Sequence, residues 1–279
     1  MPGATATNIR KADLAEDLGK LLLRQFCALA PISKSDDFGI DTIATLLEID
    51  EQNSLREIAN KTFGVQFKTK SVREIKFLKE YEFNWLLNLD YPYFICSVDN
   101  SNSSMHIYSL HMVNAMPGIK NNCDGLIITL DEKKDKQKKE DVLKLWLGDP
   151  IIDLSIHDIL DKNLLNHKKQ ILKKWIVGEY DNIKIRNIGL TKAFYWETNK
   201  MPVFDALNKI FTSIENPDIY KECTDYLDAA LFELKLFNEN RELENSIEEI
   251  NIKLKEKGVN LFFLNNIDFE AYRRKNKST

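Results

Sequence analysis

Residues 40–49 read IDTIATLLEI and residues 62–69 read TFGVQFKT, and these two runs decide the fold. Both are rich in β-branched and aromatic residues, which favour strands. In the second run, alternation with a period of two places Gln66 and Lys68 on one face and apolar residues on the other. Because an unpaired lysine among apolar strands is costly, Lys68 requires a carboxylate or phosphate partner.

Helices and further strands surround these two runs. Residues 9–29 place leucines at helical spacing and predict an amphipathic helix, and residues 72–89 also read as helix. PYFICSVD (92–99) and MHIYSL (105–110) are joined by the turn sequence NSNSS and predict a hairpin. The order helix, strand, strand, helix, strand, strand indicates an α/β or α+β layer structure.

The chain changes character after about residue 115. A short apolar strand is followed by a lysine-rich run that we expect to be an exposed loop, and then by one last strand and a turn. From about residue 160 the pattern is mostly helical, over 160–178, 203–215 and 217–257. We therefore predict a first domain over residues 1–155 and a helical assembly or partner-binding domain over residues 156–279.

The composition narrows the class of protein. The 279 residues carry 39 Lys and Arg against 43 Asp and Glu, a formal charge of −4, and 43% are apolar, which is ordinary for a globular chain. Ten Gly and seven Pro are few, which favours helices over a turn-rich sandwich or barrel. Four scattered cysteines, no signal-like N-terminus and no apolar run of about 18 residues predict a cytoplasmic protein that does not cross the membrane.

Charge is unevenly spread along the second half. Residues 162–200 hold nine basic and three acidic side chains interleaved with aromatic residues, whereas residues 205–256 hold six basic and thirteen acidic ones. The basic segment suits a nucleic-acid backbone groove or is a solvated face. In the acidic segment an apolar a/d pattern fits either an assembly helix or a helix packed on its neighbours; it consists of Leu243, Ile247, Ile250 and Leu254.

Motifs of several enzyme classes are missing from the sequence. None of the four histidines has the spacing of metal ligands. The sequence also has no GxSxG, Walker or GxGxxG motif, so it lacks the residues that a serine hydrolase, an NTPase or a dinucleotide-binding protein requires. Asp41 at the start of the first run can meet Gln66 and Lys68 on its neighbour, with Glu16 approaching from the preceding helix. Such oxygen ligands suit a hard divalent cation, with the lysine beside the water to be activated.

These residues carry a resemblance to a known family. The layout helix, Asp37-Phe38-Gly39-Ile40-Asp41, strand, Val65-Gln66-Phe67-Lys68-Thr69, helix, strand resembles the PD-(D/E)XK nuclease superfamily. Within it, the chain is most similar to the Mrr-like restriction-endonuclease branch and to nuclease domains of bacterial anti-phage defence systems, in which a glutamine commonly replaces the second acidic residue. The resemblance covers about residues 9–110. Gln66 follows Asp41 by 25 positions, and this long separation implies an insertion at 50–61.

The resemblance implies a restriction-endonuclease-like mixed sheet flanked by helices, followed by a mostly helical C-terminal region. It implies catalytic roles for Asp41, Gln66, Lys68 and Glu16, with Mg²⁺ or Mn²⁺ held by Asp41 and Gln66; Glu16 alternatively forms a helix-capping box with Asp13. The expected activity is phosphodiester hydrolysis, with DNA favoured over RNA. A basic edge that would contact backbone phosphates, or is a solvated helix face, consists of Lys70, Arg73 and Lys76.

Because its net charge is negative, the isolated chain is expected to bind a polyanion such as nucleic acid only weakly. We therefore expect activity to depend on self-association or on a partner. For relatives of this kind the partners include SMC-type ATPases and Argonaute-like guides, which is an analogy. The alternative function is a catalytically silent scaffold or nucleic-acid-binding subunit that keeps the nuclease fold as a platform, and a small-molecule hydrolase on the same cluster is a third option.

Overall fold

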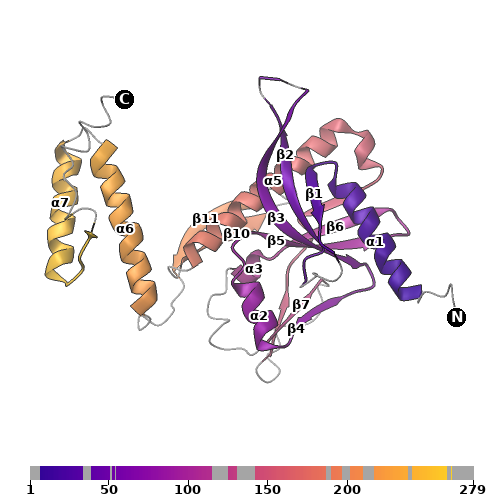
Figure 1. The fold of residues 1–279 in the computed structure, drawn as a ribbon, viewed down its shortest axis with the longest axis horizontal. Helices are drawn as coiled ribbons and strands as arrows, with labels where there is room; N and C mark the ends of the chain where they lie inside the picture. The colour runs from indigo at the N-terminus through magenta and orange to yellow at the C-terminus, as the bar shows by residue number, and fades with distance from the viewer. Residues whose placement is uncertain are drawn as a thin grey trace. The chain divides into compact units, whose positions relative to one another are not determined.

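The computed structural model describes residues 7–33, 39–50, 52–53, 55–114, 125–130, 142–186, 190–196, 202–209, 217–237, 241–262 and 265. It is a mixed α/β structure in which a six-stranded and a three-stranded sheet are flanked by helices (Figure 1). The mixed α/β class agrees with the prediction, although β1 and β4 add two strands to the expected order over the first 110 residues. Among the described helices, none has both the length and the apolar character needed to cross a bilayer.

The large sheet contains the two runs that decide the fold. Its strand order is β1-β2-β3-β5-β6-β9, with β3 and β5 parallel and every other neighbouring pair antiparallel. The 50–61 segment is accommodated by long strands that pair well beyond the body of the sheet. The strands are β1 (Cys27–Pro31), β2 (Thr42–Ile49), β3 (Glu57–Thr69), β5 (Tyr93–Asp99), β6 (Ser104–Ser109) and β9 (Ile152–Ser155).

A second, smaller sheet pairs a strand from the crossover between β3 and β5 with two strands that follow β6 in the chain. It consists of β4 (Glu74–Phe77), β7 (Gly125–Thr129) and β8 (Val142–Trp146), and the chain continues from β4 into helix α2 (Glu80–Leu87). Figure 1 shows α2 beside β4 and β7. This crossover brings α2 and β4 to the face of the large sheet that bears Gln66 and Lys68.

Two apolar cores lie on opposite faces of the large sheet. One joins the sheet to helices α1 (Thr7–Leu23) and α5 (Lys162–Arg186), and the fully buried Trp175 of α5 belongs to it. The other joins the sheet to α2 and the small sheet through residues such as Phe77 and Phe83. The fold therefore has three layers, and its central strands are covered on both faces.

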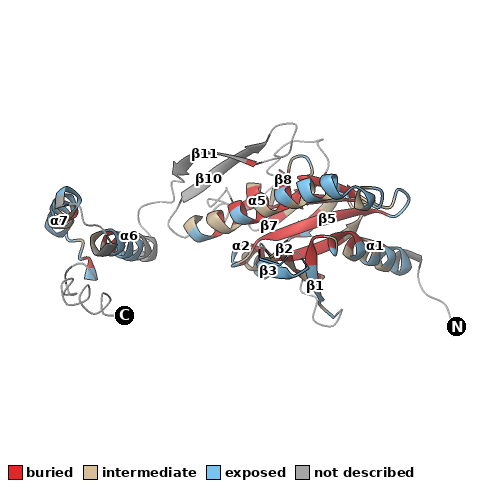
Figure 2. Ribbon diagram, turned by 90° about the horizontal axis from the view of Figure 1, so that it is seen from above, coloured by how far each residue is buried: buried red, intermediate tan, exposed pale blue. Residues whose placement is uncertain are grey.

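Strand β5 shows why this sheet must be covered on both sides. All seven of its residues are buried, as expected for a nearly continuous apolar run at the centre of a sheet. Phe94 and Cys96 pack toward α1 and α5, whereas Tyr93 and Ile95 pack toward the small sheet. Figure 2 shows buried residues along β5 and exposed residues on the outer sides of α1 and α5.

The remaining elements complete the two compact units into which the contacts divide the chain. The first unit is residues 1–186 with 190–210, and the second is residues 211–279 with 187–189. This division lies later than the expected boundary at residue 155, because α5 packs on the large sheet. The other elements are α3 (His111–Asn114), the 3₁₀ turn η1 (Asp158–Leu160), β10 (Leu190–Trp196), β11 (Pro202–Lys209), α6 (Pro217–Phe237) and α7 (Arg241–Glu256).

Three helix predictions need correction. The helix predicted over 9–29 ends at Leu23, since the following residues pair with β2 as strand β1. The helix predicted over 72–89 is β4 followed by the shorter α2, because Ile75 and Phe77 pack into the second core and β4 pairs with β7. The helix predicted over 203–215 is wrong over residues 203–209, which belong to strand β11 and pair with β10.

Two other expectations have different outcomes. In the a/d pattern, Ile247 and Leu254 pack in a small core of the second unit, whereas Leu243 and Ile250 are 36% and 43% exposed. Packing on neighbouring helices therefore accounts for half of the pattern, and an assembly role stays a prediction. The lysine-rich run at 131–141 lies outside the described residues.

Candidate active site

Asp41 is fixed against strand β3 by its backbone and by its side chain. Its amide donates to the Val65 carbonyl at 3.0 Å, and its carboxylate accepts a hydrogen bond from the Phe67 amide. β2 begins at the next residue, so the Phe67 amide lies where the ladder between β2 and β3 ends. The carboxylate thus takes the place of a strand partner, which places it beside the Gln66–Phe67 peptide bond.

Gly39 shapes the turn that delivers Asp41. Its φ is +106°, a conformation that residues with a Cβ rarely adopt. Its carbonyl accepts a hydrogen bond of 2.7 Å from the Tyr93 hydroxyl on β5, and a Cβ added here would lie 3.3 Å from the Trp85 ring. The glycine of the D-x-G-I-D motif is therefore required by both backbone conformation and space.

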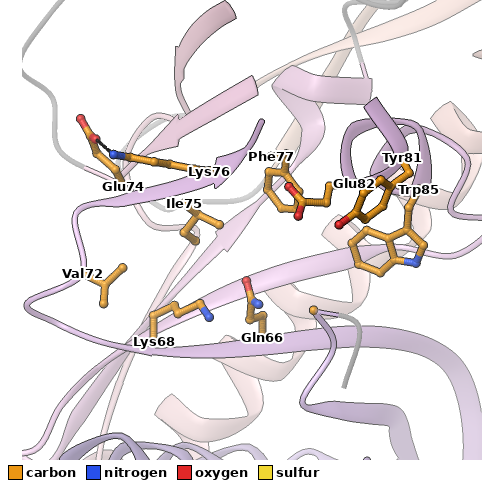
Figure 3. Close-up of a pocket in the computed structure, with 11 residues that line it drawn as sticks. Gln66, Lys68, Val72, Glu74, Ile75, Lys76, Phe77, Tyr81, Glu82 and Trp85 are labelled. Atoms are coloured by element: carbon orange, nitrogen blue, oxygen red, sulfur yellow. Dashed lines mark ion pairs between the residues drawn. The ribbon is translucent and has the colours of Figure 1, made fainter. Parts of the chain in front are cut away.

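Gln66 and Lys68 share a cavity of about 980 Å³ on the face of the sheet that α2 and β4 cover. Figure 3 shows both side chains directed into this cavity, with the Lys68 ammonium pointing toward Gln66. Their neighbour Phe67 faces the opposite way, into the core under α1. Strand alternation thus places the two residues together as the sequence predicts. The cavity is lined by Gly39, Gln66, Lys68, Val72, Glu74, Ile75, Lys76, Phe77, Tyr81, Glu82 and Trp85.

Both polar side chains from β3 have unused bonding capacity within the described part of the chain. Gln66 is 7% exposed, and its Oε1 is buried with no hydrogen-bond partner among those residues. Lys68, which is half-buried, has no ion pair with them either. A buried acceptor without a partner costs free energy, and a bound ion or ligand would satisfy it.

Two carboxylates on the other walls already have cationic partners. Glu74 accepts from Lys144 at 2.5 Å and lies 3.6 Å from Lys76, and the Lys144 hydrogen bond lowers the pKa of Glu74. Glu82 accepts from the Lys79 amide at 3.3 Å, at the start of α2. The Glu82 carboxylate also lies 3.8 Å from the Lys79 ammonium, so both acidic groups have a lysine beside them at the cavity.

Glu16 does not join this group. It forms an ion pair with Lys20, one turn along α1. Helix α1 packs on the opposite face of the sheet, where a Cβ on Gly19 would overlap the Phe67 ring. Glu16 is not among the residues that line the cavity.

The proposed basic edge is partly committed to ion pairs within the chain. Lys70 donates to Asp99 at 2.7 Å, and this hydrogen bond is the main reason that the pKa of Asp99 falls to about 2. Lys76 lines the cavity beside Glu74. Arg73 precedes β4, and its carbonyl accepts from the Leu130 amide. Of the three, Lys76 is the one placed at the cavity.

Tyr81 and Trp85 line the cavity and were not expected from the sequence. They lie four residues apart on α2 and share one face of that helix with Glu82, whereas Phe83 and Leu86 point into the core. The available signal was the short alternating run EIKF at 74–77, which marks β4 and makes 80–87 a separate amphipathic helix. With 72–89 predicted as one helix, this wall of the site was missed.

The donor set suits an oxygen-seeking cation of the Mg²⁺ type. Among the residues described, no group of three His, Cys, Asp or Glu side chains could hold a metal ion. Mg²⁺ in proteins commonly uses one or two carboxylates and keeps several waters, which substrate phosphates replace. The Asp41 carboxylate and the unpartnered Gln66 Oε1 match that need; Asp37 of the motif lies outside the described residues.

Comparison with protein-family models, with curated proteins and with solved structures finds no match to this chain. The geometry described above is therefore the basis of the functional argument.

Proposed function

We propose that the chain is a metal-dependent nuclease that hydrolyses phosphodiester bonds, with DNA favoured over RNA, and that it acts as the effector subunit of an anti-phage defence complex. The observation that carries the catalytic part is the buried Gln66 Oε1, which has no partner among the described residues, in a cavity shared with Lys68. The Asp41 carboxylate is anchored on the amide of the following residue, Phe67, although Asp41 itself is not among the residues that line the cavity. The resemblance to PD-(D/E)XK nucleases supports the same reaction and is the basis for the defence role.

Asp41, Gln66 and the main-chain carbonyl of Phe67 would hold Mg²⁺ or Mn²⁺. Such an ion lowers the pKa of a bound water and polarises the scissile phosphate. The hydrogen bond from the Phe67 amide fixes the Asp41 carboxylate, so that it is oriented before any ligand arrives. Gln66 contributes a neutral oxygen and so avoids the repulsion that a second carboxylate near Asp41 would add.

Lys68 supplies the remaining group that the reaction requires. Its ammonium points toward Gln66 across the cavity (Figure 3) and has no ion-pair partner in the described part of the chain. There it orients the attacking water and offsets negative charge that develops on the phosphorane. Because Glu74 and Glu82 are satisfied by other lysines, they do not compete for it.

Activation by assembly follows from the charge balance. The chain carries a formal charge of −4, and Lys70 is engaged by Asp99. A polyanion is bound through many cationic contacts, and here 43 acidic side chains outweigh the 39 basic ones. We therefore assign tight substrate engagement to a second copy or to a partner, through the second unit.

The competing candidate is a silent scaffold with the same fold. It is favoured by one observation: among the described residues, neither Asp41 nor Glu16 lines the cavity that holds Gln66 and Lys68, and no group of three His, Cys, Asp or Glu side chains could hold a metal ion. A scaffold needs no metal and should be indifferent to changes in Asp41 and Lys68.

The two candidates are separated by a cleavage assay on plasmid and single-stranded substrates in Mg²⁺, Mn²⁺ or EDTA. We expect metal-dependent cutting by the wild type that is lost in Asp41→Asn and Lys68→Ala. The matched control is Lys61→Ala, which removes an exposed lysine from the same strand without touching the cavity. Metal-dependent cutting that survives in both site variants would contradict the proposal.

A further inference from the structure

The cavity has an aromatic wall that catalysis at Asp41, Gln66 and Lys68 does not require. Tyr81 is 65% exposed although it is large and partly apolar, and Trp85 is only half-buried. Figure 3 shows the two rings near each other at one end of the cavity, with Gln66 and Lys68 along its floor. Exposed rings of this kind in a concave site are suited to stacking on a flat ligand.

Trp85 is held in place by its surroundings. Its ring meets Tyr93 edge-to-face, with centroids 6.0 Å apart, and packs against Gly39. Tyr81 is contacted by Lys79, whose ammonium donates to the Tyr81 hydroxyl at 2.9 Å and lies 5.4 Å from the ring centroid. Packing therefore positions Trp85 before a ligand arrives, which reduces the entropy lost on binding.

The aromatic wall lies close to the proposed reaction centre. The point where a Cβ of Gly39 would be is 3.3 Å from the Trp85 ring and 3.9 Å from the Gln66 side-chain nitrogen. Only the width of a glycine thus separates the indole from the amide. A phosphate held near Gln66 and Lys68 would have its own nucleoside within reach of Trp85.

We propose that this wall binds the nucleobase next to the scissile phosphate, so that the substrate is unpaired nucleic acid, either single-stranded or with one nucleotide flipped out. The inference rests on the proposed nuclease function. In a continuous duplex both faces of each base are covered by its neighbours, so a ring such as Trp85 can stack only on a base that has left the helix. A cavity of about 980 Å³ has room for a nucleotide.

The charges of the cavity agree with a single bound nucleotide. Lys68 and Lys76 are matched by Glu74 and Glu82 among the lining residues, so the cavity has no excess of positive charge for a run of phosphates. In a chain with a formal charge of −4, stacking supplies affinity that backbone contacts do not.

The test is oligonucleotide binding by the full-length chain in EDTA, where no cleavage occurs. Fluorescence anisotropy compares a labelled oligothymidine strand with a labelled hairpin duplex of equal charge. We expect the wild type to prefer the strand, and Trp85→Ala to weaken strand binding by about tenfold or more. Tyr81→Ala, at an exposed position, should weaken it as well, whereas Trp85→Phe should retain most of it.

The matched control is Trp146→Ala, which removes a 37% exposed tryptophan from β8 outside the cavity and should leave strand binding unchanged. Equal binding of strand and duplex, or strand binding that survives in Trp85→Ala and Tyr81→Ala, would overturn the inference. Metal-dependent cutting lost in Lys68→Ala would then still support the nuclease. Absence of binding to either oligonucleotide would overturn the inference. Absence of Mn²⁺ binding by the wild type, measured separately without EDTA, would count against the nuclease.

Discussion

Replacing Gln66 with methionine should stabilise the metal-free protein while removing its function. The side chain is 7% exposed and its Oε1 has no partner among the described residues. Leaving a buried acceptor unsatisfied costs about 1–3 kcal/mol. Methionine has a similar length and no amide to desolvate, so Gln66→Met should raise the free energy of unfolding by about that amount. For a unit of this size, each kcal/mol corresponds to roughly 2–4 °C in the melting temperature.

The assay is urea unfolding of both proteins in EDTA and again in Mg²⁺. We expect Gln66→Met to be the more stable protein in EDTA, and Mg²⁺ to stabilise the wild type more than the variant, because only the wild type offers the amide oxygen. Gln170→Met on the exposed side of α5 is the control and should change stability little. A Gln66→Met protein that is less stable than the wild type in EDTA would refute the reasoning, since Oε1 would then be well bonded in the apo protein.

Three further predictions follow from single contacts. Gly39→Ala should lower the free energy of unfolding by about 1–3 kcal/mol, because the φ of Gly39 is +106°, and should also weaken Mn²⁺ binding by moving Asp41. Gly258 also has a positive φ, but a Cβ there would meet no neighbour, so the control Gly258→Ala should leave Mn²⁺ binding intact. Equal effects of the two changes on Mn²⁺ affinity would contradict this prediction. The hydrogen bond from Lys70 is the main cause that lowers the pKa of Asp99 from 3.8 to about 2. The ionised Asp99 therefore stabilises the folded state at pH values above 3.8, and this contribution is lost as the pH falls toward 2. Lys70→Met should therefore unfold at higher pH than the wild type in an acid titration followed by circular dichroism, and coincident acid limbs would argue against the pair. Glu16→Gln should leave the cleavage rate unchanged, because Glu16 pairs with Lys20 within α1, on the opposite face of the sheet from the cavity. A large loss of rate in a folded variant would show that Glu16 takes part in catalysis.

The parts of the fold that local pattern determines could be predicted from the sequence. Alternation in TFGVQFKT predicts that Gln66 and Lys68 share a face, and the structure places both in one cavity. The hairpin of β5 and β6 was equally evident, since two apolar runs flank a short polar turn. These features depend on neighbours within a few residues along the chain.

The parts that depend on distant partners could not be predicted in the same way. EIKF at 74–77 contains good helix formers, and it is a strand because β7, some fifty residues later, pairs with it. Without that break the wall formed by Tyr81 and Trp85 is hidden inside a longer helix. Likewise, residues 202–209 are a strand through pairing with β10.

The misplaced candidate Glu16 has a similar cause. Its position on an amphipathic helix was clear from the sequence, but which face of the sheet the helix covers was not. The close approach of Gly19 to the Phe67 ring decides this, because Phe67 points away from Gln66 and Lys68. A sequence pattern gives the two faces of a strand without saying which helix covers each.

The most direct test of the central claim is a Mn²⁺ titration of the isolated chain, followed by electron paramagnetic resonance. Metal binding does not depend on activation by a partner, so it tests the site even where cleavage requires assembly. We predict one Mn²⁺ site that is lost in Asp41→Asn, weakened in Gln66→Met and kept in Lys61→Ala. A wild type that binds no Mn²⁺, or one whose binding is unchanged in Asp41→Asn, would contradict the assignment of Asp41 and Gln66 as a metal centre.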